Sequence, residues 1–249
     1  MTEPAEAISE PSTDGDLGEL RSRHPWKGFR LEGSPMLVVL AVLMLGSLGF
    51  NAGAEWVVGT IVFIVVLLGG VVLYSWSQHG GEVATVYENG FTFKDARGEV
   101  RVRWEEVDGF WRHVIQQKVN GIKGATTHKY RVRLLDGREI VLGNHLEGPA
   151  TLGSAVESGS APAIYARSVA ALRRGDSIEC GPFVLRPEGI ESSGKVVPWP
   201  DVESMDFVQG FARISIREAK RALTAPVASV KNCAVAYELV NRLAGAANG

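Results

Sequence analysis

The hydrophobic residues of this 249-residue chain follow two different patterns. Between residues 35 and 77 they form two continuous apolar segments, which are separated by Glu55 and contain no other Lys, Arg, Asp or Glu. After residue 77, apolar and polar residues alternate along short stretches. About 20 consecutive apolar residues are the length that a helix needs to cross a membrane, whereas alternation is typical of β-strands with one buried face. The pattern therefore predicts a transmembrane helical hairpin over 35–77 and a β-rich portion after it.

Residues 1–34, which precede the hairpin, change in character along their length. The first part is acidic, rich in Pro, Ser and Thr and poor in large apolar residues, a composition that favours a disordered tail. A basic juxtamembrane segment follows, with Arg21, Arg23, Lys27 and Arg30. Because the loop between the two apolar segments carries no positive charge, the positive-inside rule predicts a multi-pass cell-membrane protein with both termini cytoplasmic. The alternative, a cleaved signal peptide, is disfavoured because a second apolar segment follows the first at once.

Short alternating stretches separated by turn signals occupy the chain from residue 82 onward. Asn89-Gly90 and Asp136-Gly137 are dipeptides typical of tight hairpin turns, and further turns recur about every ten residues. This spacing indicates antiparallel sheets that are strongly bent or closed. Helices are predicted over 161–174 and 227–243, whereas residues 148–160 are small and polar enough to form a loop or a poorly formed helix.

The β-rich portion contains an internal repeat, in which Gly-apolar, a second Gly and Trp-x-acidic-Val occur twice in the same order. The matching positions are Gly90, Phe91, Gly98, Trp104 and Val107 in the first block and Gly189, Ile190, Gly194, Trp199 and Val202 in the second. Self-similarity of this kind indicates duplicated domains, which we place at 82–175 and 176–249. The second block is the shorter one. It is either a complete domain or a partial one that completes itself on the first.

The same positions resemble the bacterial pleckstrin-homology-like (PH-like) domains, and the resemblance extends over about 82–243. Together with the hairpin, the chain resembles a bacterial family of two-span membrane proteins that carry such domains in tandem. The resemblance implies that each block is a bent antiparallel β-barrel closed by a C-terminal helix, with a role in binding or scaffolding. The predicted fold class is therefore an α-helical transmembrane hairpin plus an α+β portion of tandem PH-like barrels.

Charge suggests one candidate binding surface. The chain as a whole is nearly neutral, with 26 Lys and Arg against 28 Asp and Glu, but basic residues outnumber acidic ones between 94 and 138. Spacing of two residues places the basic side chains of each strand on one face of a sheet. The candidate residues are Arg101, Arg103, Lys129, Arg131 and Arg133. They predict contact with anionic phospholipid head groups or a protein partner, and the alternative is an ordinary solvated face.

Other chemistry finds little support in the sequence. The five histidines show no metal-ligand spacing, the Gly/Ser-rich stretch near 153–160 lacks the Lys-Ser/Thr of a phosphate loop, and no nucleophile elbow is present. Cys180 and Cys233 are predicted to be small buried residues. We therefore expect no catalytic residues, no metal, no cofactor and no nucleic-acid partner.

These expectations combine into one functional prediction and one alternative. The prediction is a membrane-anchored, non-enzymatic binding or scaffold protein, which displays two cytoplasmic PH-like domains to a protein partner or to the anionic inner leaflet of the lipid bilayer. The alternative is a membrane-tethered enzyme or small-ligand sensor with a pocket between the two domains. A deep polar cavity at that junction would favour the alternative.

Overall fold

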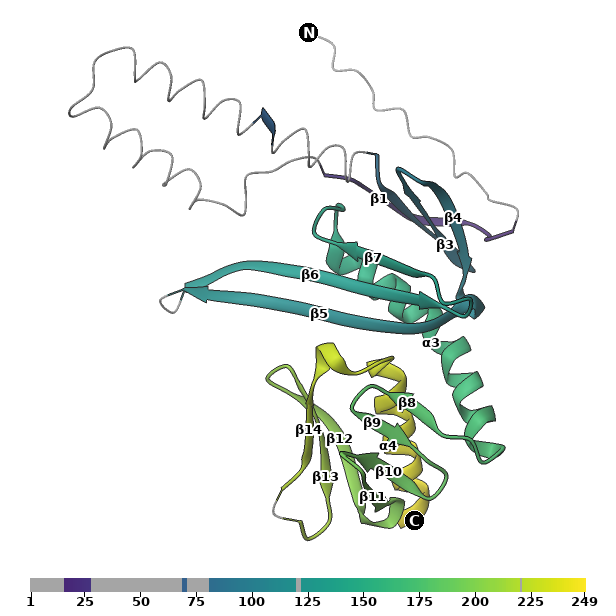
Figure 1. The fold of residues 1–249 in the computed structure, drawn as a ribbon, viewed down its shortest axis with the longest axis vertical. Helices are drawn as coiled ribbons and strands as arrows, with labels where there is room; N and C mark the ends of the chain where they lie inside the picture. Colours follow the sequence, from purple (N-terminus) through teal and green to yellow (C-terminus); the bar gives the residue numbers. More distant parts are fainter. Residues whose placement is uncertain (1–15, 28–68, 71–80, 120–121, 220) are drawn as a thin grey trace, which may run out of the picture.

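The structure is a computed structural model that describes residues 16–27, 69–70, 81–119, 122–219 and 221–249 (Figure 1). These residues form an N-terminal module and a C-terminal module, which are drawn in the upper and lower parts of Figure 1. The two modules have the same order of elements: a four-stranded antiparallel sheet, a short 3-10 helix, a three-stranded antiparallel sheet and a helix.

The N-terminal module has sheet orders β1-β2-β3-β4 and β5-β6-β7. Its elements are β1 (Leu20–Pro25), β2 (Val83–Tyr87), β3 (Gly90–Asp95), β4 (Gly98–Arg103), η1 (Trp104–Glu106), β5 (Val107–Val119), β6 (Ile122–Leu134), β7 (Glu139–Gly143) and α3 (Pro149–Arg173). Strands β5 and β6 are 13 residues each and form a long hairpin that extends to the left in Figure 1.

The C-terminal module has sheet orders β11-β10-β9-β8 and β12-β13-β14. Its elements are β8 (Ile178–Cys180), β9 (Phe183–Leu185), β10 (Gly189–Ser192), β11 (Lys195–Pro198), η2 (Trp199–Asp201), β12 (Val202–Val208), β13 (Phe211–Ile216), β14 (Leu223–Pro226), η3 (Val227–Ser229) and α4 (Cys233–Asn248). All seven strands are thus present, and each is shorter than its counterpart in the N-terminal module.

Two glycines of the sequence repeat have the same structural role. Gly90 begins β3 and Gly189 begins β10. A Cβ atom at Gly90 would lie 2.2 Å from the carbonyl oxygen of Val102, and one at Gly189 would lie 2.2 Å from that of Val197. Neither contact is possible for a side chain, so the close approach of the paired strand requires glycine in both modules.

The repeated tryptophans also occupy matching places. Trp104 is 7% exposed and Trp199 is 5% exposed, and each begins the 3-10 helix of its module. The indole N–H of Trp104 donates to the carbonyl of Glu88 at 2.8 Å, and that of Trp199 donates to the carbonyl of Arg186 at 3.0 Å. Each ring therefore fills the core while its polar atom is satisfied by the turn before the third strand of the module, β3 or β10.

Helix α3 is continuous over 25 residues, which corrects the prediction of a loop or a poorly formed helix at 148–160. The small residues have a packing role. A Cβ atom at Gly153 would lie 2.2 Å from the Tyr130 ring, and one at Gly159 would lie 2.5 Å from the Trp104 ring. Both aromatic rings therefore lie directly against the helix backbone. Pro162, which would fall in the first turn of the helix predicted over 161–174, lies inside α3.

The predicted membrane hairpin is contradicted. Among the described residues, no helix has the length and apolar character needed to cross a membrane. The predicted segment 35–77 itself lies outside the described residues except for Gly69 and Gly70. Arg21 and Arg23, on which the predicted orientation relied, belong to strand β1 of a folded sheet. The predictions of a multi-pass cell-membrane protein with cytoplasmic termini and of a membrane-anchored function are corrected accordingly.

The predicted barrels and the predicted tail are corrected as well. The described strands form four separate antiparallel sheets, and one isolated bridge, Trp26–Leu146, links the end of β1 to the chain after β7. The described strands therefore do not form a continuously hydrogen-bonded, closed barrel in either module. Residues 20–25, where the disordered tail was predicted to give way to a basic juxtamembrane segment, form β1 because they pair with β2 across a long sequence separation. Residues 1–15 and 28–34 lie outside the described part.

Candidate functional site

An open cleft of about 930 Å³ lies between the two sheets of the N-terminal module. One wall is the turn between β3 and β4 with the start of β4, at residues 95–100. The opposite wall is formed by residues 127–129 of β6 and by residues from 138 to 145, which include β7. Sequence reasoning missed this site because its walls are far apart in the chain and each wall is an ordinary strand or turn.

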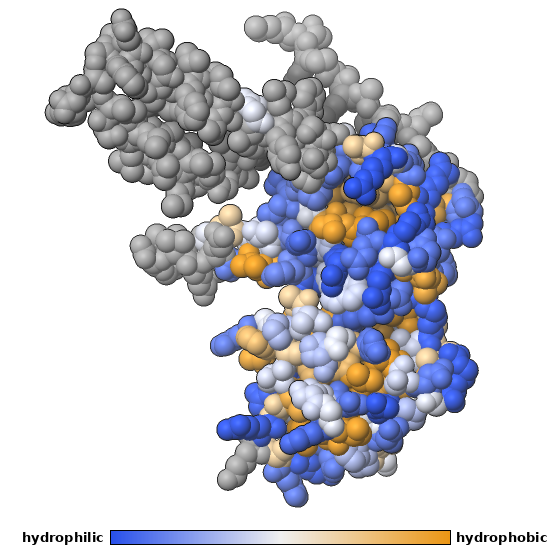
Figure 2. Space-filling model, in the orientation of Figure 1, coloured by the Kyte–Doolittle hydropathy of each residue, from blue (hydrophilic) through white to orange (hydrophobic). Residues whose placement is uncertain are grey.

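The floor of the cleft is apolar and its rim is charged. Phe93, Leu134 and Ile140 line it and are 8%, 3% and 6% exposed, so they belong to the core. The charged lining residues near the rim are Asp95, Arg97, Glu99, Lys129, Arg138 and Glu139. Figure 2 shows apolar areas framed by hydrophilic residues on the visible face of both modules. An apolar floor with a polar rim is the usual composition of a ligand site.

One end of the cleft is formed by a close contact between a carboxylate and an imidazole. His145 Nε2 lies 2.9 Å from Glu82 Oε2, and the Glu82 side chain is 9% exposed. The backbone N–H of Trp26 donates to the carbonyl of Glu82 at 2.8 Å, and that of Lys27 donates to the carbonyl of His145 at 3.0 Å. The chain therefore leaves β1 and returns to β2 at the same end of the cleft. Glu82 and His145 are engaged with each other there, so they contribute shape and charge to this end.

The five predicted basic residues do not form one surface. Arg101 and Arg103 are exposed on β4, where Arg101 Nε lies 3.8 Å from Glu99 and Arg103 pairs with Asp16. The other three lie on β6, which belongs to the second sheet, and of the five only Lys129 lines the cleft. Contact of these residues with anionic head groups or with a protein partner stays a prediction.

Arg131 and Arg133 have a different environment from the one predicted. Their guanidinium carbons lie 4.4 Å and 5.2 Å from the centre of the Trp111 ring, within the range of cation–π attraction. Arg133 Nη2 also lies 2.7 Å from Asp108 Oδ2. Arg133 is therefore part of the junction between the modules, whereas Arg131 stays exposed at the outer face of the sheet.

The junction between the modules depends on the segment before α4. Lys231 Nζ donates to Asp108 Oδ2 at 2.9 Å. The Asn232 side chain accepts a hydrogen bond from the N–H of Phe110 at 2.8 Å and donates one to the carbonyl of Asp108 at 3.0 Å. The backbone N–H of Asn232 donates to the carbonyl of Phe110 at 2.9 Å. Asn232, which belongs to the C-terminal module, thus hydrogen-bonds to the backbone of β5 in the N-terminal module.

Asp108 makes this junction sensitive to acid. Burial raises the pKa of Asp108, but hydrogen bonds from Lys231 and Arg133 lower it more, so it lies below its usual value. A carboxyl group with a lowered folded pKa stabilises the fold above its unfolded pKa of about 3.9, and this stabilisation is lost as the pH falls through the folded pKa.

We predict that Asp108→Asn lowers the melting temperature at pH 7 and flattens its fall below pH 4. The neutral amide does not titrate, so the part of acid destabilisation that comes from this carboxylate disappears. Thermal unfolding of the wild type and the variant between pH 7 and pH 2 measures the difference. Parallel curves over the whole range would show that the carboxylate does not contribute.

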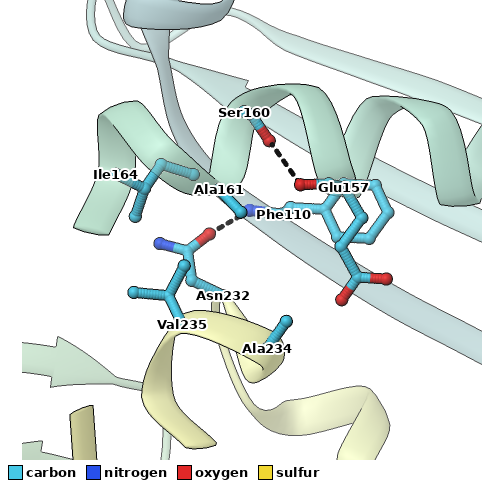
Figure 3. Close-up of a pocket in the computed structure, with 8 residues that line it drawn as sticks. All are labelled: Phe110, Glu157, Ser160, Ala161, Ile164, Asn232, Ala234 and Val235. Carbon is cyan, nitrogen blue, oxygen red and sulfur yellow. Dashed lines mark hydrogen bonds between the residues drawn. The ribbon is translucent and has the colours of Figure 1, made fainter. Parts of the chain in front are cut away.

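The alternative function required a ligand pocket between the two domains, and the hollow found there is too small to be one. The hollow at the junction has a volume of about 10 Å³, about that of one water molecule. Figure 3 shows it between β5, α3 and the start of α4, with the Asn232 side chain directed at the Phe110 backbone. Glu157 at its edge has a raised pKa because of burial, and Arg112 at 3.4 Å partly offsets that rise. This hollow, formed by described residues of both modules, is too small for a ligand larger than water.

The two cysteines are buried and unbridged, in agreement with their predicted role as small core residues. Burial raises the pKa of both Cys180 and Cys233 to about 12, which keeps the thiols protonated at neutral pH. Within the described part of the chain, no group of three or more His, Cys, Asp or Glu side chains is arranged to hold a metal ion.

Comparison with known proteins gives one match. A family model described as a family of unknown function (DUF6585) matches residues 8–247. No curated protein and no solved structure matches the chain. The match includes both modules and the residues between β1 and β2.

Proposed function

We propose, from the premise that the chain belongs to the family of unknown function DUF6585, that it is a binding protein whose ligand lies in the cleft of the N-terminal module. The observation that supports this proposal is the cleft itself, at about 930 Å³ with an apolar floor and a charged rim. Ligand pockets in proteins usually measure about 300–1,000 Å³ and combine these two kinds of lining. The hollow that the described residues form at the junction between the modules is far smaller, at about 10 Å³.

Binding without catalysis is part of the proposal. The charged groups at the rim, such as Arg97, Glu99 and Lys129, suit the orientation of a ligand in a solvated position. The acid–base pair that lines the cleft, Glu82 with His145, is held at one end by its mutual contact and by the backbone around it. A catalytic site needs such a pair to be aimed at a reacting atom beside a nucleophile or an oxyanion site.

The predicted resemblance to PH-like domains also belongs to the proposal. The order of four strands, three strands and a closing helix in each module supports it, as do the matching glycines and tryptophans. What the resemblance implies for function is binding or scaffolding, in agreement with a ligand cleft. Function rests on the site more than on the fold, so the cleft is the feature to test.

A bulky residue in the cleft tests the proposal. Val100 is partly exposed, lines the cleft and packs beside the core, so Val100→Trp is expected to project added volume into the open space. The probe is the apolar anionic dye 1-anilinonaphthalene-8-sulfonate, titrated against the purified full chain. We expect the variant to lose at least half of the saturable fluorescence increase, because the dye and the indole compete for the same apolar floor.

The matched control is Val196→Trp, which adds the same side chain on β11 of the C-terminal module, at a position 46% exposed. This variant is expected to bind the dye like the wild type. Urea unfolding of all three proteins checks that the fold is intact. Equal dye titrations for Val100→Trp and the wild type would remove the cleft as the ligand site.

A further inference from the structure

Strand β7 has one edge that pairs with no other described strand. It pairs with β6 on one side and is the last strand in the order β5-β6-β7. The N–H of Leu134 donates to the carbonyl of Arg138 at 2.9 Å, which identifies this pair as hydrogen-bonded. Hydrogen-bonded and non-hydrogen-bonded pairs alternate along an antiparallel ladder. The N–H and C=O groups of Glu139 and Val141 therefore point away from β6, toward the edge of the sheet.

The cleft runs along this edge. Successive side chains of a strand point to opposite faces of the sheet. Ile140 is 6% exposed and faces the core, whereas Val141 is 42% exposed and faces outward, as does Glu139. All three line the same cleft. A hollow that touches both faces of one strand follows the edge of that strand, where the backbone groups of Glu139 and Val141 pair with no other described strand.

We propose that the cleft takes an extended peptide segment of a partner protein, which adds to the sheet as a strand beside β7. This inference rests on the proposed function and names the class of ligand. Backbone hydrogen bonds to Glu139 and Val141 supply the pairing, in the mode known as β-augmentation. Strand β7 has five residues and so offers a track of about 16 Å at ~3.3 Å per residue.

The lining determines which peptides fit. On one face of the added strand, alternate side chains meet the apolar floor at Phe93, Leu134 and Ile140, so those peptide positions are apolar. On the other face, side chains meet the exposed side chains of Glu139, Val141 and Lys129 in a solvated position, so those positions tolerate polar or charged residues. The segment that the cleft favours therefore alternates apolar and polar residues, as one strand of a half-buried sheet does.

A second copy of the chain is the competing source of a strand. The cleft has an opposite wall at residues 95–100, so the incoming strand enters a space bounded by β7 on one side and the β3–β4 turn on the other. A single peptide strand fits this space more readily than the edge of another complete sheet. Self-association through β7 is an outcome that the test distinguishes.

The test begins with peptides selected on the purified full chain from a random-sequence display library. We expect 1:1 binding by peptides with alternating apolar residues, and at least a tenfold weaker Kd for Val141→Pro than for Val141→Thr. Proline removes the N–H that faces the added strand but leaves the β6–β7 ladder intact, whereas threonine keeps that N–H. Thermal unfolding checks the fold of both variants.

A second measurement needs no change in the protein. The selected peptide is synthesised with N-methyl groups on one set of alternate residues or on the other. N-methylation of the set whose N–H groups face β7 is expected to weaken binding at least tenfold. N-methylation of the other set is expected to have little effect.

The following results would overturn the inference. It fails if no peptide is selected, if neither N-methylated set weakens binding, or if Val141→Pro binds as tightly as Val141→Thr. It also fails if the full chain is a dimer that Val141→Pro converts to a monomer. Loss of binding in Val100→Trp with retention in Val141→Pro would keep the cleft as the ligand site while removing strand addition.

Discussion

Replacing Trp104 with alanine is expected to lower the free energy of unfolding by about 3–5 kcal/mol, the usual cost of deleting a buried large aromatic side chain. The ring is 7% exposed and stacks on Phe91 at a centroid distance of 5.8 Å. Its N–H donates to the carbonyl of Glu88, which loses a partner in the variant. Gly159 of α3 lies against the ring, so the helix also loses a contact surface.

Two further variants separate the parts of this effect. Trp104→Phe keeps an aromatic ring but removes the N–H, so its expected cost is smaller, about 1–3 kcal/mol from a reduced core volume and an unsatisfied carbonyl. Trp199→Ala is the matched change in the C-terminal module, where the ring is 5% exposed, and a similar loss is expected. Urea unfolding followed by far-UV circular dichroism measures all three. A loss below 1 kcal/mol for Trp104→Ala would contradict the packing described for the repeat.

Asn232→Ala is expected to destabilise the junction between the modules by about 2–4 kcal/mol, since it removes two side-chain hydrogen bonds and leaves their backbone partners without replacement. Those partners are the N–H of Phe110 and the carbonyl of Asp108. Asn232 also has a φ of +53°, a left-handed conformation that asparagine tolerates better than alanine does. The amides of residues 108–110 should therefore exchange their hydrogens faster in the variant.

Two controls identify the cause of that effect. Asn232→Gly loses the same hydrogen bonds but tolerates the positive φ, so it is expected to be more stable than Asn232→Ala by about 1 kcal/mol. Asn241→Ala removes a similar pair of bonds, to the N–H and carbonyl of Met205, within the C-terminal module alone. This last variant should leave exchange at residues 108–110 unchanged. Equal exchange there in Asn232→Ala and Asn241→Ala would mean that Asn232 does not hold the junction.

The sequence predicted those features that depend on neighbouring residues. Asn89-Gly90 and Asp136-Gly137 do lie at hairpin turns. Strand β7 follows the expected alternation at first, whereas β2 and β3 are mostly buried on both faces. The repeat was visible because Gly90 and Gly189 each face a carbonyl oxygen where no side chain fits. Such constraints act between adjacent strands of one hairpin, so a single sequence records them.

Other features depend on partners that are distant in the sequence. Strand β1 forms because residues 20–25 pair with β2, and composition alone gave no sign of that partner. Helix α3 includes Gly153 and Gly159 because the rings of Tyr130 and Trp104 fill the space beside them. Glycine disfavours an isolated helix, so local propensity predicted a loop there.

The candidate site shows the same limit more strongly. The two-residue spacing of the basic residues placed Lys129 and Arg131 on the same side of one strand, and both are exposed in the structure. It did not show that Arg133 contacts Asp108 and Trp111. The cleft was missed because an unpaired strand edge is a property of the whole sheet. The alternation at 139–142 predicted a strand and gave no information on which of its edges is paired.

Amide hydrogen exchange at Glu139 and Val141 tests the central claim most directly. Their N–H groups face the edge of β7 that pairs with no other described strand, so in the free chain they should exchange much faster than those of Ile140 and Leu142, which face β6. Saturation with a selected peptide should slow exchange at Glu139 and Val141 by at least tenfold and leave Ile140 and Leu142 little changed. Exchange at Glu139 and Val141 that stays equally fast with the peptide bound would contradict strand addition at this cleft.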